Sequence, residues 1–294
     1  MMYYLLFFLL KLISYIPFRV LYVLSDGLYY LLYYVVRYRR KVVRRNLTES
    51  FPDKTEKEIL QVEKKFYRYF TDQVLESCKM TTISAEEMSK RMKFTNIEEA
   101  NAILRGGNTI ALYMGHYGNW EWVSSIPLCI AKGVKAVQIY HRLHNESMDK
   151  LMLHIRERMG AISVEMRKTA RYITEQENNG SVCIIGLIAD QSPRVKELRY
   201  FLPFLNHQTP VLTGTEKIIK HYCLEAWFLK MKRVKRGYYE AELIRMHENP
   251  SLLPDFELTD LYYEMLEQMI QTQPELYLWS HNRFRHATRL VKQV

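Results

Sequence analysis

An apolar run that leads into a glycine-containing turn restricts the possible folds of this chain more than any other part of the sequence. Residues 109–114 read Thr-Ile-Ala-Leu-Tyr-Met, and residues 115–121 read Gly-His-Tyr-Gly-Asn-Trp-Glu. A second apolar segment, residues 123–130, follows at once and can continue as a helix. Because Gly115 and Gly118 relax the backbone between the two apolar segments, the pattern predicts a strand, a tight turn and a helix.

The turn carries a histidine and a glutamate that suit acid–base chemistry. On a regular helix His116 and Glu121 would lie about 140° apart, so they can meet only if His116 lies in the turn and Glu121 in the helix. Open α/β sheets bind ligands at the carboxyl ends of their strands, which is where His116 is expected. A carboxylate beside an imidazole fixes its tautomer and stabilises its cation, as a general base requires. The alternative is a polar turn in which Asn119 caps the helix and Glu121 is solvated.

From residue 92 onward, apolar segments of strand length alternate with helical patterns. Strands are predicted at residues 92–95, 109–114, 134–140, 161–164 and 182–189. Helices are predicted at residues 97–104, 120–131, 145–159 and 169–177. Residues 191–212 are predicted to be a loop, and residues 225–232 and 238–245 a hairpin. This alternation implies an α/β fold with a mostly parallel central sheet and helices on both faces.

The first 45 residues have a different composition from the rest of the chain. Residues 2–24 and 28–36 are apolar and rich in tyrosine, and residues 37–45 are rich in arginine. Tyrosine and flanking basic residues are typical of a segment at the membrane surface, so residues 1–45 are predicted to be a membrane anchor and residues 46–294 a catalytic domain. About 20 apolar residues are needed to cross a bilayer, and Lys11 interrupts the first run. A spanning anchor, an interfacial anchor and a pair of buried helices in a soluble protein therefore all stay open.

The formal net charge of +10 is compatible with nucleic acid, anionic lipid or an acidic substrate as the partner. The arginine run adjoins the apolar segment, and the chain carries no nucleic-acid-binding motif, which favours anionic membrane lipid and argues against nucleic acid. The four cysteines stand far apart and have no metal-ligand spacing, so no metal site is predicted from them.

Four further stretches carry polar residues that could line the same crevice. They contain Arg156 and Arg158, then Arg167, then Asp190 and Gln191, and finally residues 274–285. Each has a simple structural explanation, because surface arginines are usually solvated and an aspartate after a strand often caps a turn.

Taken together and in this order, the motifs resemble those of the bacterial late acyltransferases of lipid A biosynthesis, a branch of the glycerolipid and lysophospholipid acyltransferases. The wider group has a histidine followed five positions later by an acidic residue, which His116 and Glu121 match. The tyrosine-rich start, Ala-Asp-Gln at 189–191 and Leu-Trp-Ser-His-Asn-Arg-Phe-Arg at 278–285 extend the resemblance over nearly the whole chain. Residues 204–206 read Phe-Leu-Asn where the family commonly has Phe-Phe-Gly, which leaves the shape of that loop open.

The resemblance implies transfer of an acyl group from a thioester, with acyl carrier protein as the donor, to a hydroxyl of a lipid A precursor at the cytoplasmic face of the inner membrane. It implies that His116 is the general base and that Glu121 orients it. The residues expected to bind substrate are Asn119, Arg156, Arg158, Arg167, Asp190 and Gln191. The arginines would bind phosphate or stabilise the oxyanion, and Asp190 would bind an arginine or a sugar hydroxyl. No metal or other cofactor is implied.

The chain has no Gly-x-Ser-x-Gly motif and no paired reactive cysteine, which favours direct transfer in a ternary complex over an acyl-enzyme. Coenzyme A is an alternative donor. The same chemistry on a lysophospholipid, aminolipid or glycolipid is an alternative function. A non-catalytic membrane protein that binds lipid is an alternative of another class.

Overall fold

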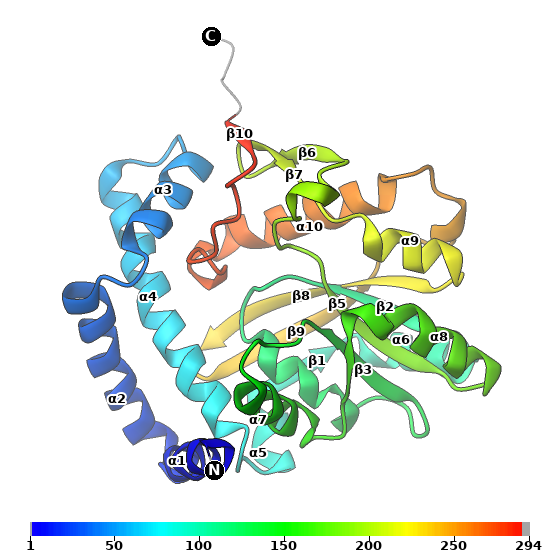
Figure 1. Cartoon of the computed structure of the whole chain (residues 1–294), viewed down its shortest axis with the longest axis horizontal. Helices are drawn as coiled ribbons and strands as arrows, with labels where there is room; N and C mark the ends of the chain where they lie inside the picture. Colours follow the sequence, from blue (N-terminus) through cyan, green and yellow to red (C-terminus); the bar gives the residue numbers. More distant parts are fainter. Residues whose placement is uncertain (1, 290–294) are drawn as a thin grey trace.

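A seven-stranded sheet lies at the centre of the computed structural model, which describes residues 2–289 (Figure 1). Its strands are β1 (Met92–Thr95), β2 (Ile110–Met114), β3 (Lys135–Tyr140), β4 (Ile162–Glu165), β5 (Cys183–Ile188), β8 (Glu225–Lys235) and β9 (Tyr238–Arg245). They are arranged in the order β1-β9-β8-β2-β5-β3-β4. Every neighbouring pair is parallel except β8 and β9, which form the predicted antiparallel hairpin. The mostly parallel sheet and all seven strands of the prediction are therefore confirmed.

Helices cover both faces of this sheet, again as predicted. They are α5 (Ala85–Arg91), α6 (Ile97–Arg105), α7 (Glu146–Glu157), α8 (Thr169–Asn178), α9 (Gly214–His221) and α10 (Glu257–Thr272). In Figure 1, α10 lies above the sheet and α7 lies below it. β2 is buried along its whole length, as expected for a central parallel strand with apolar side chains on both faces.

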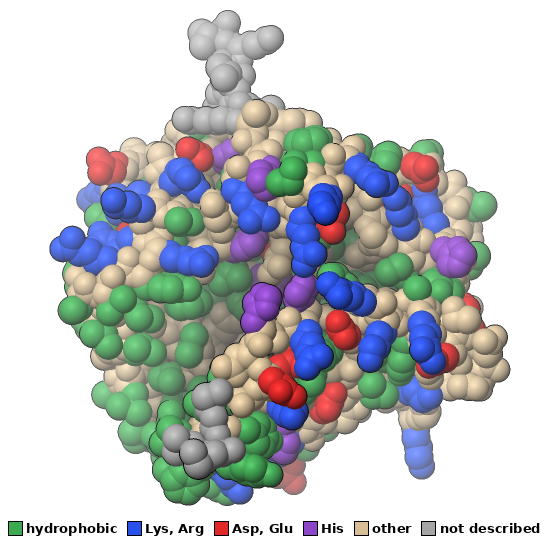
Figure 2. Space-filling view, viewed as in Figure 1, with side chains coloured by type: hydrophobic (Ala, Val, Ile, Leu, Met, Phe, Trp, Pro, Cys, Tyr) green, Lys and Arg blue, Asp and Glu red, His purple; other side chains and the backbone are tan. Residues whose placement is uncertain are grey.

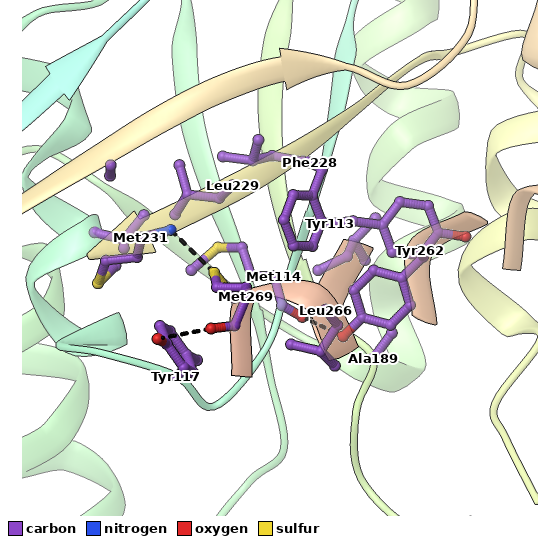
Figure 3. Close-up of a cluster of buried hydrophobic side chains, with 14 of the residues drawn as sticks. Tyr113, Met114, Tyr117, Ala189, Phe228, Leu229, Met231, Tyr262, Leu266 and Met269 are labelled. Atoms are coloured by element: carbon purple, nitrogen blue, oxygen red, sulfur yellow. Dashed lines mark hydrogen bonds between the residues drawn. The ribbon is translucent and has the colours of Figure 1, made fainter. Parts of the chain in front are cut away.

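The packing of α10 against the sheet fixes the ends of two strands. Figure 3 shows Tyr262 beside Tyr113 and Phe228, and the rings of Tyr262 and Tyr113 stack with their centroids 4.7 Å apart. The Tyr262 hydroxyl donates to the carbonyl of Met114 at 2.8 Å, at the end of β2. The next residue, Tyr263, donates to the carbonyl of Ala189 at 3.0 Å, just beyond β5. The ring contacts of Tyr262 anchor α10 on the sheet, and the two hydroxyl bonds tie it to the carboxyl ends of β2 and β5. α10 therefore holds these two strand ends in place.

Two segments differ from the sequence prediction. The helix expected at 120–131 is a 3₁₀-helix, η2 (Trp120–Leu128), because Pro127 has no N–H and cannot continue an α-helical hydrogen-bond pattern. The loop expected at 191–212 contains β6 (Phe201–Phe204) and β7 (His207–Pro210), which form a second sheet with β10 (Thr288–Arg289). Leu205 and Asn206 both have positive φ, so the Phe-Leu-Asn departure from the family motif forms the tight turn between β6 and β7.

The N-terminal part folds as successive helices along one side of the molecule (Figure 1). They are α1 (Met2–Tyr15), α2 (Phe18–Tyr30), the π-helix η1 (Leu31–Val36), α3 (Arg40–Ser50) and the long α4 (Glu56–Lys79). Among residues 2–289 no single helix meets the length and hydropathy needed to cross a bilayer, whereas Leu6–Tyr15 and Phe18–Val36 meet them jointly, with a bend of 117° between them. α3 continues across the boundary expected between residues 45 and 46, so no break in the structure marks it.

The turn after β2 depends on glycine at position 118. Gly118 has φ of +58°, and a Cβ at this position would collide with the sulfur of Met231 on β8. We expect Gly118→Ala to lower the free energy of unfolding by about 2–4 kcal/mol, because the left-handed backbone and the overlap both oppose a side chain. Gly180→Ala is the matched control, since Gly180 has φ of +62° and no atom near its Cβ position. Urea denaturation of both variants separates the cost of the left-handed backbone from the cost of the overlap with Met231. An equal loss of unfolding free energy in the two variants would contradict the role given to Met231.

Candidate active site

His116 and Asp190 meet because β2 and β5 are adjacent and in register. Met114 at the end of β2 pairs with Ile188 at the end of β5, so residues two positions beyond each strand lie opposite one another. Asp190 accepts two hydrogen bonds from His116, one from the backbone N–H at 3.0 Å and one from ring Nδ1 at 2.7 Å. The Asp190 side chain is only 3% exposed and that of His116 is 16% exposed. The histidine is therefore held on its buried side by a carboxylate and keeps a surface-facing edge.

The hydrogen bond to Asp190 sets the protonation of the imidazole. An ionised carboxylate only accepts hydrogen bonds, so Nδ1 carries the proton and Nε2 is the unprotonated, accepting nitrogen when the ring is neutral. Burial alone would lower the pKa of His116, but the charge and hydrogen bond of Asp190 outweigh it and raise the pKa above its ordinary value. Burial would raise the pKa of Asp190, but the same pairing and the nearby Arg283 lower it. Asp190 thus stays ionised, and His116 is a stronger base than a free histidine.

The segment that follows α10 holds the His116 turn (residues 115–119) from outside the sheet. The backbone N–H of Gly118 donates to the carbonyl of Leu276 at 3.0 Å, and that of Leu278 donates to the carbonyl of His116 at 3.1 Å. The Tyr117 hydroxyl donates to the carbonyl of Met269 at 3.1 Å, near the end of α10. The position of His116 therefore depends on backbone hydrogen bonds to residues 276–278 as well as on the contact of its side chain with Asp190.

Gln191 and two residues of the C-terminal motif complete the surroundings of His116. The Gln191 amide nitrogen lies 3.2 Å from Nε2 of His116, and its role in binding substrate stays a prediction. His281 accepts a hydrogen bond from the backbone of Ser192 at 3.4 Å, and burial lowers its pKa to about 4, so it is neutral at pH 7. Arg283 is buried and donates to the Tyr263 hydroxyl at 3.1 Å. His281 and Arg283 were not predicted as site residues, although both lie in the C-terminal motif.

Glu121 does not contact the imidazole, and this corrects the expected pairing with His116. Its two carboxylate oxygens accept hydrogen bonds from Nε and Nη2 of Arg156 on α7, at 2.7 and 2.6 Å. Both side chains are largely buried, with 11% of Glu121 and 23% of Arg156 exposed. The hydrogen-bonding partner that orients His116 is Asp190, and Glu121 orients Arg156. Glu121 acts on His116 only through its charge, which helps to raise the histidine pKa.

Three of the residues expected to bind substrate contact other parts of the molecule or lie away from His116. Asn119 is fully buried, and its amide donates to Glu76 at 2.8 Å and accepts from the backbone of Trp122 at 3.3 Å. This corrects its assignment, because neither end of its side chain is available to a substrate. Arg158 donates to the carbonyl of Met80 at 2.6 Å. Arg167 is exposed beyond β4, which β3 separates from β5, so its role in binding stays a prediction.

The loop after Asp190 and two segments that adjoin it carry exposed basic side chains. We call this group the basic rim; its exposed members are Arg142, Arg194, Lys196, Arg199 and Arg285. Arg194 lies 3.2 Å from ring Nε2 of His141, and Arg285 donates to the carbonyl of Pro193 at 3.4 Å. In Figure 2 this face is hollowed between the hydrophobic side chains on the left and the Lys, Arg and His side chains at the centre. The hollow thus lies between an apolar and a cationic surface.

A separate cleft of about 650 Å³ opens between α1 and α7, and His116 is not among its lining residues. Over the described part of the chain, no three His, Cys, Asp or Glu side chains are grouped so that they could hold a metal ion.

Comparison with protein families identifies one family over almost the entire sequence. The model of the bacterial lipid A biosynthesis acyltransferases matches residues 1–286. The match includes the N-terminal helices, the sheet and the C-terminal motif around His281. A comparison with curated proteins gave no significant match.

Proposed function

The chain belongs to the bacterial lipid A biosynthesis acyltransferases, and we propose that it moves an acyl chain from acyl carrier protein to a hydroxyl of a lipid A precursor with His116 as the general base. The hydrogen bond from His116 to buried Asp190 carries this proposal. It gives the imidazole the tautomer in which Nε2 can accept a proton, and a base of this kind is what attack by a lipid hydroxyl requires. Asp190 and the segment after α10 that position His116 both lie within residues 1–286, which the family model matches.

The proposed reaction is a direct transfer of the acyl group from the thioester sulfur to the hydroxyl oxygen. The hydroxyl oxygen attacks the thioester carbonyl carbon while its proton moves to Nε2 of His116. Asp190 stabilises the resulting imidazolium. The tetrahedral intermediate then expels the sulfur, the C–S bond breaks, and the imidazolium returns the proton to the thiolate. The products are an ester and a free thiol, and His116 ends in its starting form.

Arg156 is the group that we assign to a phosphate of the acceptor or to the oxyanion. A guanidinium has five N–H donors, and Glu121 takes two of them, so three stay available. The bidentate pair fixes the plane of the guanidinium, which makes Arg156 a preorganised anion ligand. Glu121 is then a positioning residue for Arg156. Its preservation in the family signature is explained by anion binding and not by contact with the histidine.

We propose that α1, α2 and η1 lie in the surface of the inner membrane. Their outward side chains form the apolar face, defined by Tyr4, Phe8, Leu9, Leu12, Tyr15, Val20, Val23, Leu24, Tyr30, Leu31, Tyr34, Val35 and Val36. Figure 2 shows this hydrophobic surface on the left, with Lys and Arg side chains above it. Apolar side chains beside cations match the acyl region and anionic headgroups of a bilayer. A lipid acceptor could then reach the adjacent hollow without leaving the membrane.

The basic rim supports an acidic acyl donor, which would dock on the side of the hollow opposite the apolar face. Arg194, Lys196 and Arg199 follow Gln191 closely, so an acidic partner docked on them would deliver its thioester beside His116. Complementary charge accelerates encounter and fixes orientation. An acidic carrier protein would contact more of the basic rim than free coenzyme A, so acyl carrier protein is the favoured donor.

The full-length protein in mixed micelles tests the assignment. Incubation of a lipid A precursor with acyl carrier protein charged with a defined acyl chain should yield a product heavier by one acyl group in mass spectrometry. Acyl-coenzyme A should give less product at equal concentration, because its phosphates would contact a smaller part of the basic rim than an acidic protein does. An unchanged precursor, together with acylation of a lysophospholipid in the same assay, would overturn the acceptor assignment. Equal rates with the two donors would overturn the donor assignment alone.

A further inference from the structure

A single buried glutamate accepts four hydrogen bonds, three on its carboxylate and one on its backbone carbonyl. Glu76 on α4 is fully buried, and its Oε1 accepts a hydrogen bond from the Tyr22 hydroxyl at 2.9 Å. Its Oε2 accepts from Asn119 at 2.8 Å and from the Tyr239 hydroxyl at 2.8 Å. Its backbone carbonyl accepts from the indole N–H of Trp122 at 3.1 Å. These donors belong to α2, to β9 and to the consecutive His116 turn and η2, so three stretches that are far apart in the sequence meet at Glu76.

Two of the four bonds hold the segment that carries the reactive groups. Asn119 ends the His116 turn, and Trp122 is next to Glu121 at the start of η2. Asn119 also accepts from the backbone N–H of Trp122 at 3.3 Å, so the two attachments are themselves connected. A shift of Glu76 would therefore move both the His116 turn and the first turn of η2. Glu76 touches no reacting atom and acts only through these neighbours.

The bond from Tyr22 reaches the part of the molecule that we place on the membrane. Tyr22 lies on α2 between Val20 and Val23, both of which are exposed on the apolar face. The turn of the β8–β9 hairpin holds it from the other side, since Arg236 donates to the Tyr22 carbonyl at 3.1 Å. A Cβ at Gly237 would collide with the Tyr22 hydroxyl, so that hydroxyl has little free space beside it. Its position is consequently coupled to that of α2.

We propose that Glu76 is a positioning residue that couples the docking of α2 on a lipid surface to the placement of the His116 turn. The coupling rests on the proposed function, since it takes the apolar face as the membrane contact and His116 as the base. The path is contiguous, from α2 through the Tyr22 hydroxyl to Glu76 and on to Asn119. Buried hydrogen bonds of this kind transmit displacement because a broken one leaves a buried polar group without a partner. The site is thus ordered most completely when the enzyme is on its lipid surface.

Tyr22→Phe is the most specific test, because it removes only the α2 attachment and leaves Asn119 and Tyr239 on the carboxylate. Tyr69→Phe is the matched control: Tyr69 is also buried, lies on α4, and its hydroxyl has no hydrogen-bond partner. Glu76→Gln is a second variant, since its amide keeps one accepting oxygen for Asn119 and Tyr239. All are compared as full chains, in detergent micelles and on vesicles of phosphatidylethanolamine and phosphatidylglycerol.

Hydrogen exchange of residues 115–122 gives a readout that does not require activity. We expect vesicles to slow exchange there in the wild type and in Tyr69→Phe, but not in Tyr22→Phe. On vesicles, kcat of Tyr22→Phe should fall about 3- to 10-fold with KM and vesicle binding unchanged, and Glu76→Gln should lose less. Equal exchange and equal kcat in Tyr22→Phe and Tyr69→Phe would overturn the coupling. If the wild type acylates no lipid A precursor, the proposed function fails, and the exchange data alone still decide the coupling.

Discussion

Replacing His116 with alanine is expected to reduce the rate of acyl transfer by about 10²- to 10⁴-fold, which is the range for removal of a general base. The reason is that Nε2 of His116 is the site that we assign to the hydroxyl proton, and the Gln191 amide, 3.2 Å from Nε2, cannot take that proton. Single-turnover measurement with saturating donor separates the chemical step from binding, and KM for both substrates should change little. Thermal denaturation should show a loss of stability, because buried Asp190 loses its hydrogen-bonded partner, and this loss is measured separately from the rate.

His247→Ala is the control for this variant. His247 follows β9 and is exposed, and it lies outside the set of residues around Asp190. It should retain full activity and thermal stability. If His116→Ala transferred acyl groups as fast as His247→Ala, the enzymatic mechanism would be wrong, and a role in lipid binding would become the better explanation of the site.

The elements around the site could be predicted from the sequence because local signals there agree. The apolar run before Gly115 is too short for a helix and ends at a glycine turn, so β2 and the position of His116 follow from it. The β8–β9 hairpin was equally predictable, since Gly237 separates two alternating segments. η2 was predicted as an α-helix because periodicity alone does not weigh the effect of Pro127 on the hydrogen-bond pattern.

The carboxylate at His116 could not be predicted because it depends on strand order. Glu121 is near in sequence, whereas Asp190 is 74 residues away. β3 follows β2 along the chain, but β5 lies between them in the sheet, and only this crossover puts Asp190 beside His116. Asp190 was singled out as a polar residue after a strand, but its partner required the register of β2 with β5. The burial of Asn119 was equally hidden, since Glu76 comes from a helix outside the α/β unit.

Asp190→Asn is expected to lower kcat by about 10²- to 10⁴-fold, although it keeps the size of the side chain. An amide can donate to Nδ1, which favours the tautomer with the proton on Nε2 and removes the lone pair that accepts the hydroxyl proton. The matched variant is Glu121→Gln, which should mainly raise KM for the phosphorylated acceptor through Arg156. Steady-state kinetics with varied acceptor distinguish the two, and a larger kcat loss in Glu121→Gln would return the orienting role to Glu121.

The pH dependence of kcat/KM gives an independent test of the Asp190 assignment. Activity requires neutral His116, so the rate should fall as pH decreases through the histidine pKa, which Asp190 holds above the ordinary value of 6.5. Without the charge of Asp190, burial is the largest remaining influence and lowers that pKa, so the acid limb should move to lower pH in Asp190→Asn. Glu121→Gln removes a smaller attraction, so its limb should move less. An acid limb that stays in place in Asp190→Asn would contradict the pairing.

A double substitution shows whether Asp190 acts only through His116. If it does, adding Asp190→Asn to His116→Ala should cause little further loss of kcat, because the group that Asp190 orients is already absent. If Asp190 also contacted substrate, the two losses would multiply. Stability should also be non-additive, because either single variant already removes the hydrogen bond between His116 and Asp190. A double variant whose kcat is close to that of His116→Ala alone is therefore the signature of a residue that acts through the base.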